Sequence, residues 1–147
     1  TKVLDINMSF ARIIGLDVGS KRIGIALSDP LLITAQPLKT INREPEEKSL
    51  QEISAICAEN NVKTVIVGLP KNMNGSIGEQ AIDCQQYADK VKNHTGLEVI
   101  FEDERLTSYQ AEKVLALQNK KYTRNKGLVD VTSAVIILQQ HLDRRRH

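Results

Sequence analysis

The sequence predicts a single α/β domain in which a mixed, five-stranded sheet carries helices on both faces. Its length of 147 residues fits one domain at the usual ~100–200 residues. Several short apolar runs have strand character, and the first two are close enough in sequence to form an antiparallel hairpin. The later runs alternate with segments of helical periodicity, which is the pattern of strands joined by helices.

The composition is that of an ordinary soluble globular protein, with 41% hydrophobic and 26% charged residues. The formal net charge is only +2, from 20 basic and 18 acidic residues, so any attraction to nucleic acid must come from local patches. With two Phe, three Tyr and no Trp, the chain has few aromatic rings for a base-stacking platform of the kind that single-strand binders use.

Cysteine, histidine and hydropathy patterns argue against further classes. Cys57 and Cys84 lie far apart in predicted helices, and we interpret them as reduced, half-buried thiols. The three histidines form no cluster, which argues against a zinc enzyme. No apolar run approaches the ~18 residues of a membrane span and no signal peptide is recognisable, so we expect a cytoplasmic protein without membrane contact.

The first half of the chain is expected to form a hairpin, a third strand and a helix. Residues 13–17 and 23–28 are apolar runs joined by a short turn, and a third strand follows over about residues 33–40. Pro45, next to an acidic stretch, marks the start of a helix whose apolar residues repeat at helical spacing. Residues 1–11 are expected to be a flexible N-terminal extension of a domain that spans residues 12–147.

The second half of the chain alternates strands and helices. The elements expected here are a strand, a helix, a strand and two helices, over about residues 62–68, 77–94, 97–104, 107–117 and 128–144. The first of these strands is β-branched and almost wholly apolar, which is typical of an interior strand covered on both faces. Gly96 is placed to end the helix before it as a C-terminal cap.

Three acidic positions stand out because each closes or enters an apolar element, and the first is Asp17. Its carboxylate follows apolar strand residues, where it loses hydration unless it meets a cation, a donor or solvent at the end of the sheet. Gly15 and Gly19 leave the backbone on either side open to close approach by a ligand. The alternative is an Asp that only caps the turn before Lys21, and we favour the functional interpretation.

The second position is the acidic triplet of Glu102, Asp103 and Glu104 at the end of a predicted strand. Adjacent carboxylates repel one another, so the cluster is stabilised by a cation, and Arg105 is the alternative to a bound metal. Strand alternation places Glu102 and Glu104 on one face and Asp103 on the other. Only one face can point at a shared site, and the pattern does not choose between them.

The third position is Asp130, early in the last predicted helix. One interpretation is an acidic residue in the first helical turn that complements the helix dipole; the other places it at the end of the sheet with Asp17. Three converging carboxylates suit Mg²⁺ or Mn²⁺, which prefer oxygen ligands and leave room for phosphate oxygens. Two such ions about 4 Å apart can activate water and stabilise the leaving oxygen in phosphodiester hydrolysis.

Basic and polar loop residues can hold a phosphate backbone beside these carboxylates. The candidates for nucleic-acid binding are Lys21, Arg22, Lys71, Asn72, Arg105, Lys120, Lys121, Arg124 and Lys126. The alternative is a set of solvated loop side chains. The loop KNMNGSIGE lacks the G-x-x-x-x-G-K-[ST] pattern of a nucleotide-binding loop, so we interpret it as a loop that positions nucleic acid or only turns the chain.

The chain resembles the YqgF family, also called RuvX, in four segments that keep the family's order and spacing: GLDVGSKRIGIALSD, VGLPKNMNGSIGEQA, FEDERLTSYQAE and LVDVTSAVIILQ. The resemblance runs from about Arg12 to Leu142 and implies a fold similar to ribonuclease H and to the RuvC resolvase. It also implies catalytic and metal-binding roles for Asp17, Glu104 and Asp130, and so selects Glu104 from the acidic triplet.

The resemblance implies a nuclease, dependent on Mg²⁺ or Mn²⁺, that matures the 5′ end of pre-16S ribosomal RNA. The alternative is a Holliday junction resolvase acting on branched DNA. The first-strand pattern also resembles sugar kinases and actin-like ATPases, but these need two domains to enclose ATP. A noncatalytic nucleic-acid-binding module is a further alternative. The expected partners are nucleic acid and the ribosome, and the expected state is a monomer or a homodimer.

Overall fold

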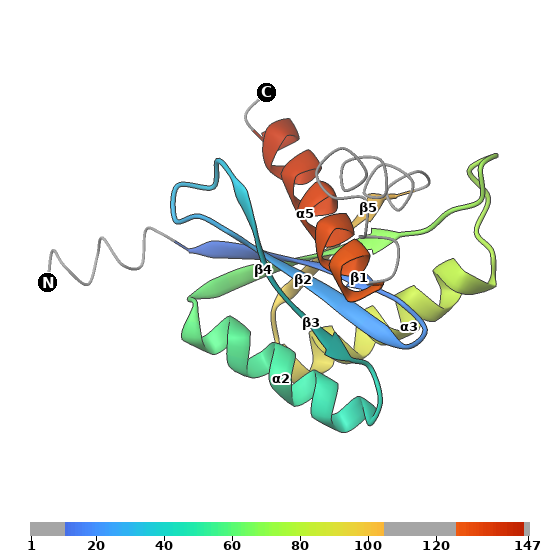
Figure 1. Ribbon diagram of the computed structural model, residues 1–147, viewed down its shortest axis with the longest axis horizontal. Coiled ribbons are helices and arrows are strands. Elements are labelled where there is room, and N and C mark those ends of the chain that lie inside the picture. The colour runs from blue at the N-terminus through green and yellow to red at the C-terminus, as the bar shows by residue number, and fades with distance from the viewer. Residues whose placement is uncertain (1–10, 105–125, 146–147) are drawn as a thin grey trace, which may run out of the picture.

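A five-stranded mixed sheet forms the centre of the computed structural model, which describes residues 11–104 and 126–145. The strand order is β3-β2-β1-β4-β5 (Figure 1). The strands are β1 (Arg12–Val18), β2 (Arg22–Ser28), β3 (Ala35–Asn42), β4 (Val62–Leu69) and β5 (Glu98–Asp103). β2 pairs antiparallel with β1 and β3, whereas β4 pairs parallel with β1 and β5. The predicted hairpin and the predicted interior strand are therefore confirmed.

Helices cover both faces of this sheet, as predicted (Figure 1). α2 (Glu46–Glu59) and α3 (Glu79–Thr95) pack on one face, and α5 (Lys126–Arg145) crosses the other. Because side chains alternate along a strand, the sheet separates two hydrophobic cores. On β1, for example, Ile14 and Leu16 belong to the core under α2 and α3, whereas Ile13 belongs to the core under α5.

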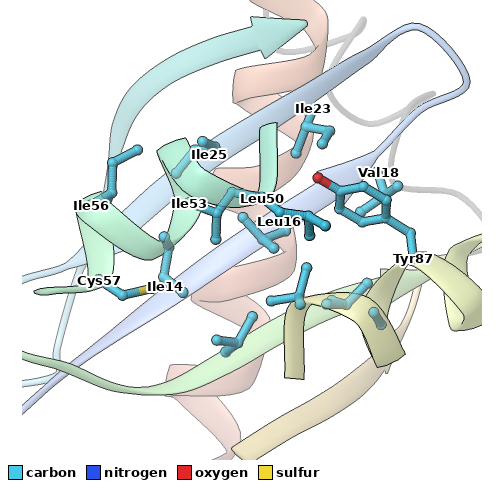
Figure 2. Packing of buried hydrophobic residues seen from close by; sticks show 14 of the residues in the cluster. Ile14, Leu16, Val18, Ile23, Ile25, Leu50, Ile53, Ile56, Cys57 and Tyr87 are labelled. Atoms are coloured by element: carbon cyan, nitrogen blue, oxygen red, sulfur yellow. The ribbon is translucent and has the colours of Figure 1, made fainter. Parts of the chain in front are cut away.

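The core under α2 and α3 is built from large side chains (Figure 2). Fully buried members from the strands and the two helices are Ile14, Leu16, Ile23, Ile25, Ile53, Val65, Val67, Cys84 and Val91. Cys57 and Cys84 are free thiols in this core, and both are buried rather than half-buried as the sequence analysis expected.

The face of the sheet under α5 is instead lined with small residues. Gly15, Gly24 and Gly68 lie on three neighbouring strands beneath the helix. A Cβ atom at Gly24 would lie 2.0 Å from the carbonyl oxygen of Asp130, and one at Gly15 would lie 2.8 Å from the Cβ of Leu138. α5 therefore packs directly against strand backbone. The interpretation of Gly15 as an opening for a ligand is wrong, because α5 fills that space.

Three element boundaries lie within two residues of the predicted ones. β3 begins at Ala35 rather than at residue 33, because the Asp29 carboxylate accepts hydrogen bonds from the N–H groups of Ile33 and Thr34 at 2.7 and 3.0 Å. α5 begins at Lys126 rather than at residue 128. α3 ends, as predicted, at Gly96, whose φ of 73° lies in the left-handed region that favours glycine.

Two predicted segments lie outside the described residues. They are the N-terminal extension, apart from its last residue, and the helix over residues 107–117. Among the helices of the described residues, none has the length and apolar character needed to cross a membrane.

Candidate active site

A cleft of about 280 Å³ at one edge of the sheet contains all three carboxylates singled out in the sequence. Asp17 on β1 and Glu104, directly after β5, share a side-chain hydrogen bond. Asp130, which lies beyond the first turn of α5, is near enough for its charge to act on Asp17. The cleft is lined by Asp17, Val18, Gly19, Pro70, Lys71, Asn72, Gln80, Glu104 and Asp130.

The parallel pairing of β1, β4 and β5 explains why these residues meet. The carboxyl ends of parallel strands lie at the same edge of a sheet, which is where ligands bind in open α/β folds. Gly68, near the end of β4, leaves space for the Glu104 carboxyl group between the sheet and α5. A Cβ atom at this glycine would lie 2.8 Å from Cδ of Glu104 and 2.5 Å from Cδ1 of Ile137.

Burial and mutual repulsion raise the pKa values of two of these carboxyl groups. Desolvation, followed by the charge of Asp130, raises the pKa of Asp17 to about 7. Desolvation, followed by the charge of Asp17, raises the pKa of Glu104 to about 9. At neutral pH the Asp17–Glu104 pair therefore keeps a proton, which forms the hydrogen bond between the two carboxyl groups. A bound cation would offset both the desolvation and the repulsion that keep this proton in place.

The donor set of the cleft fits a hard divalent cation. Three carboxyl groups offer only oxygen atoms, which Mg²⁺ and Mn²⁺ prefer. Within residues 11–104 and 126–145, no three acidic, His or Cys side chains are gathered closely enough to hold an ion as they stand. Asp130 is engaged elsewhere, because its Oδ2 accepts a hydrogen bond from Nε of Arg22 at 3.0 Å. A cation at the cleft would thus compete with this guanidinium group for the carboxylate.

Asp130 does not complement the dipole of its helix. α5 begins at Lys126 and has no acidic residue in its first turn, and the dipole effect is confined to that turn. Of the two interpretations offered by the sequence, the structure thus retains the one that places Asp130 at the end of the sheet with Asp17.

The acidic triplet is divided between two places. Glu104 lies in the cleft, whereas Glu102 is only 1% exposed and faces the other end of α5. There its Oε1 pairs with Nδ1 of His141 at 3.0 Å and accepts a hydrogen bond from Arg144. The predicted alternation is confirmed, since Glu102 and Glu104 are buried and Asp103 is only half-buried, but the two glutamates do not share a site.

The nucleic-acid-binding candidates are distributed unevenly around the cleft. Lys71 and Asn72 line it, and Lys21 is exposed in the β1–β2 turn. Arg22 pairs with Asp130, a contact that the sequence analysis did not predict. Lys126 is the first residue of α5. The remaining candidates, which lie outside the described residues, are Arg105, Lys120, Lys121 and Arg124.

Sequence analysis missed two residues that shape the site: Gly24, which lets the α5 backbone approach the sheet at Asp130, and Gln80, which lines the cleft. The signal for Gly24 was present, because small residues alternate with large ones along β2: Gly24 and Ala26 face α5, whereas Ile25 faces the opposite core. Small side chains on one face of a strand indicate that another element approaches closely. Gln80 has no local sequence signal.

The fold and the cleft define a ribonuclease H-like domain with three carboxyl groups in one cleft at the carboxyl edge of its parallel strands. Two solved structures have this fold over most of their length. "T. thermophilus RuvC in complex with Holliday junction substrate" is 16% identical, with a TM-score of 0.50, and the match covers 92% of this chain and 96% of that one. The Fowlpox virus resolvase, in complex with Holliday junction DNA, is 12% identical, with a TM-score of 0.57 and coverage of 92% and 99%.

The chain belongs to the RuvX family, whose model, described as "Holliday junction resolvase", matches residues 11–144. A relative from Clostridium botulinum (strain Hall) is 43% identical over 132 residues, 90% of this chain and 96% of its own. Another, from Clostridioides difficile (strain 630), is 45% identical over 132 residues, with coverage of 90% and 94%. Both relatives are named "Putative pre-16S rRNA nuclease". These matches confirm the resemblance and the predicted enzyme class, a nuclease.

Proposed function

We propose that the chain is a divalent-metal-dependent nuclease that matures the 5′ end of pre-16S ribosomal RNA. The observation that carries the proposal is the convergence of Asp17, Glu104 and Asp130 in one cleft at the carboxyl edge of the parallel strands. The names of the relatives from the two clostridial species support this substrate. The description of the family supports a second candidate, the resolution of Holliday junctions in DNA.

The three carboxylates would hold Mg²⁺ or Mn²⁺ in catalysis. The metal, when bound, supplies an activated water and stabilises the charge of the phosphate. The Asp17–Glu104 pair holds a proton at neutral pH, and this proton must leave before both carboxylates can act as ligands. Metal affinity is therefore expected to rise with pH up to the pKa of Glu104, about 9.

Nucleic acid would bind along the cleft through its phosphate backbone. Lys71 and Asn72 line the cleft, where a cation and an amide can contact phosphate oxygens. Lys21, in the neighbouring turn, is a further candidate. With RNA as substrate, a ribosomal precursor particle is the expected partner. Junction resolution would instead favour a symmetric dimer, because two strands are cut at related positions.

The direct test is a cleavage assay in Mg²⁺ and Mn²⁺ with a precursor ribosomal RNA fragment and a four-way DNA junction offered in parallel. Asp17→Asn is expected to abolish cleavage while the protein stays folded. Asp89→Asn, which changes an exposed aspartate of α3, is the matched control and is expected to cleave like the wild type.

Each outcome of this assay selects one function. Cleavage of RNA alone supports ribosomal RNA maturation, and cleavage of the junction alone supports the resolvase. No cleavage of either, with Mn²⁺ shown to bind, favours a noncatalytic binding module. Full activity of the purified Asp17→Asn protein would contradict the assignment of the site.

Lys71 provides a test of the nucleic-acid path that does not depend on cleavage. Lys71→Ala is expected to weaken binding of the RNA fragment and to reduce the slope of log affinity against log salt concentration by about 1. Lys63→Ala is the matched control, because Lys63 is an exposed lysine at the start of β4, whereas Lys71 lies in the loop after the other end of this strand. Equal salt slopes for the two variants would show that Lys71 is only a solvated side chain.

A further inference from the structure

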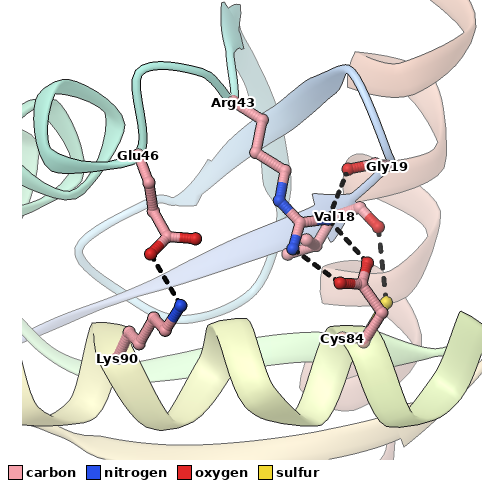
Figure 3. A network of polar contacts seen from close by, with 7 residues as sticks. Val18, Gly19, Arg43, Glu46, Cys84 and Lys90 are labelled. Carbon is pink, nitrogen blue, oxygen red and sulfur yellow. Dashed lines mark hydrogen bonds and ion pairs between the residues drawn. The ribbon is translucent and has the colours of Figure 1, made fainter.

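Arg43 is a buried cation that lies behind the β1–β2 turn, on the side of the sheet covered by α3 (Figure 3). Its residue is only 8% exposed. Nη1 donates hydrogen bonds to the carbonyl oxygen of Gly19 at 3.0 Å and to Oδ2 of Asp83 at 2.6 Å. Nη2 donates to the other oxygen of Asp83 at 2.8 Å. The guanidinium group thus joins the turn to α3.

Three backbone carbonyl groups that follow Asp17 in the chain accept hydrogen bonds from Arg43 or Cys84. Besides the bond to Gly19, the backbone N–H of Arg43 donates to the carbonyl of Lys21 at 2.9 Å. The thiol of Cys84 donates to the carbonyl of Val18 at 3.3 Å (Figure 3). Val18 and Gly19 also line the cleft, so their backbone fixes the wall next to the Asp17 carboxylate.

The orientation of the guanidinium group is itself held by several contacts. Its Cζ lies 4.9 Å from the centre of the Tyr87 ring, and the Tyr87 hydroxyl lies 2.6 Å from Oγ of Ser49. The hydrogen bond to Arg43 holds the pKa of Asp83 below its usual range, so the pair remains charged. A planar, bidentate pair specifies direction as well as attraction.

This ion pair is better explained by geometry than by stability, because the Arg43 side chain is buried whereas the Asp83 side chain is 45% exposed. Solvent weakens the attraction at the Asp83 end, and burying the charge of Arg43 carries a desolvation penalty that an apolar side chain of similar volume would not have. Around Arg43, the apolar core under α2 and α3 already supplies such packing. What an apolar side chain cannot supply is a hydrogen bond to the Gly19 carbonyl.

We propose that Arg43 is a positioning residue for Asp17. Arg43 donates hydrogen bonds both to the Gly19 carbonyl in the turn and to Asp83 on α3, and so it fixes the turn against this helix. The position of the turn sets the direction in which the Asp17 carboxylate enters the cleft. This proposal rests on the proposed function, since it concerns the affinity of the carboxylates for a divalent cation.

The test compares Arg43→Gln, Arg43→Lys and the wild type in Mn²⁺. The first measurement is the Mn²⁺ concentration that gives half of the full thermal stabilisation, which does not depend on activity. The second is the Mn²⁺ concentration for half-maximal cleavage. Loss of a residue that orients a metal ligand typically weakens metal affinity about 10–100-fold, and we expect Arg43→Gln to raise both concentrations by about tenfold. Arg43→Lys keeps the positive charge and N–H donors but loses the planar, bidentate geometry, so it should recover part of this loss.

Lys90→Gln is the matched control. Lys90 donates to Oε1 of Glu46 at 2.7 Å, and this exposed pair joins α2 to α3 without touching the turn (Figure 3). The control is expected to leave both Mn²⁺ concentrations unchanged. A general loosening of the contact between the two helices would affect it as well.

The outcomes separate this proposal from the proposed function. A folded Arg43→Gln protein with the Mn²⁺ dependence of the wild type overturns the positioning role alone. If Arg43→Gln does not fold, Asp83→Asn replaces it, and an unchanged Mn²⁺ dependence in that variant has the same meaning. A wild type that neither binds Mn²⁺ nor cleaves overturns the proposed function and the positioning role with it.

Discussion

The two faces of the sheet use different side chains and differ in what they contribute. Under α2 and α3, residues such as Ile25 and Leu16 meet the apolar side chains of two helices (Figure 2). Under α5, Gly15, Gly24 and Gly68 let the helix lie directly against the strands. Among the residues that the structure describes, the first face supplies the larger hydrophobic core, whereas the second face places Asp130 near Asp17 and leaves space for Glu104.

Glycine residues on the α5 face lower the local stability of the strands that contain them. In the interior of a strand or helix, glycine costs roughly 0.5–1 kcal/mol relative to alanine, because it loses more backbone freedom on folding. On this face, the packing of α5 directly against the strands compensates for the destabilising effect of the three glycines. The comparison teaches that the stabilising face is defined by side-chain volume, and the functional face by the position of a helix backbone.

The largest effect is expected from adding one methyl group to the α5 face. Gly24→Ala would place a Cβ atom 2.0 Å from the carbonyl oxygen of Asp130, and backbone atoms cannot yield without moving α5. We expect the free energy of unfolding to fall by about 3 kcal/mol and cleavage to be lost, because Asp130 is displaced. Urea unfolding and the cleavage assay measure the two effects.

Gly96→Ala is the control for this substitution. Nothing lies within 4 Å of a Cβ atom at Gly96, but its φ of +73° strains any other residue. We expect a cost of about 1 kcal/mol with normal cleavage. If Gly24→Ala behaves in the same way, the α5 face has no special role in placing Asp130.

The second effect is a pH dependence of the free energy of unfolding, which comes from Asp17 and Glu104 on the α5 face. The native pKa values of Asp17 and Glu104, about 7 and 9, lie above their ordinary values of 3.8 and 4.5. The native state therefore binds more protons than the unfolded state between these limits, and stability falls as the pH rises from about 4 to about 9.

Urea unfolding in a metal chelator at pH 5.5 and pH 8.5 measures this loss. Asp17→Asn is expected to remove much of the slope, and saturating Mn²⁺ is expected to reverse the loss for the wild type at pH 8.5. A wild type that is more stable at pH 8.5 than at pH 5.5 without metal would contradict the repulsion described for the cleft.

The third effect is the removal of one methylene from the opposite face. Ile25 is the neighbour of Gly24 on β2 and points, fully buried, into the core under α2 and α3. Ile25→Val is expected to cost about 1 kcal/mol of stability and to leave the cleavage rate of the folded protein unchanged. A loss of cleavage comparable to that of Gly24→Ala would show that the two faces are not independent.

The smallest effect concerns the two thiols of the α2/α3 core. Burial raises the pKa of Cys57 to about 11 and that of Cys84 to about 12, so neither forms the reactive thiolate at pH 8. Iodoacetamide is expected to modify neither cysteine in the native protein and both in urea, as followed by mass spectrometry. Fast modification of the native protein would mean that this core opens readily.

Much of the fold and the positions of the three carboxylates were predictable from the sequence. Apolar runs and helical periodicity report local structure, so they located the strands that end near Asp17 and Glu104. Alternation along β5 also predicted that Glu102 and Glu104 share a face. The resemblance then pointed to Asp17, Glu104 and Asp130, whose roles stay predictions until the cleavage assay is done.

Contacts between residues far apart in the chain were decided only by the tertiary structure. Arg22 and Asp130 are 108 residues apart in the sequence, and Arg43 and Asp83 are 40 apart. Such pairs depend on the register of the strands and on where a helix crosses the sheet, which no local pattern encodes. For the same reason, strand alternation alone left Glu102 and Glu104 on one face, and it took the structure to show that the two glutamates face different ends of α5.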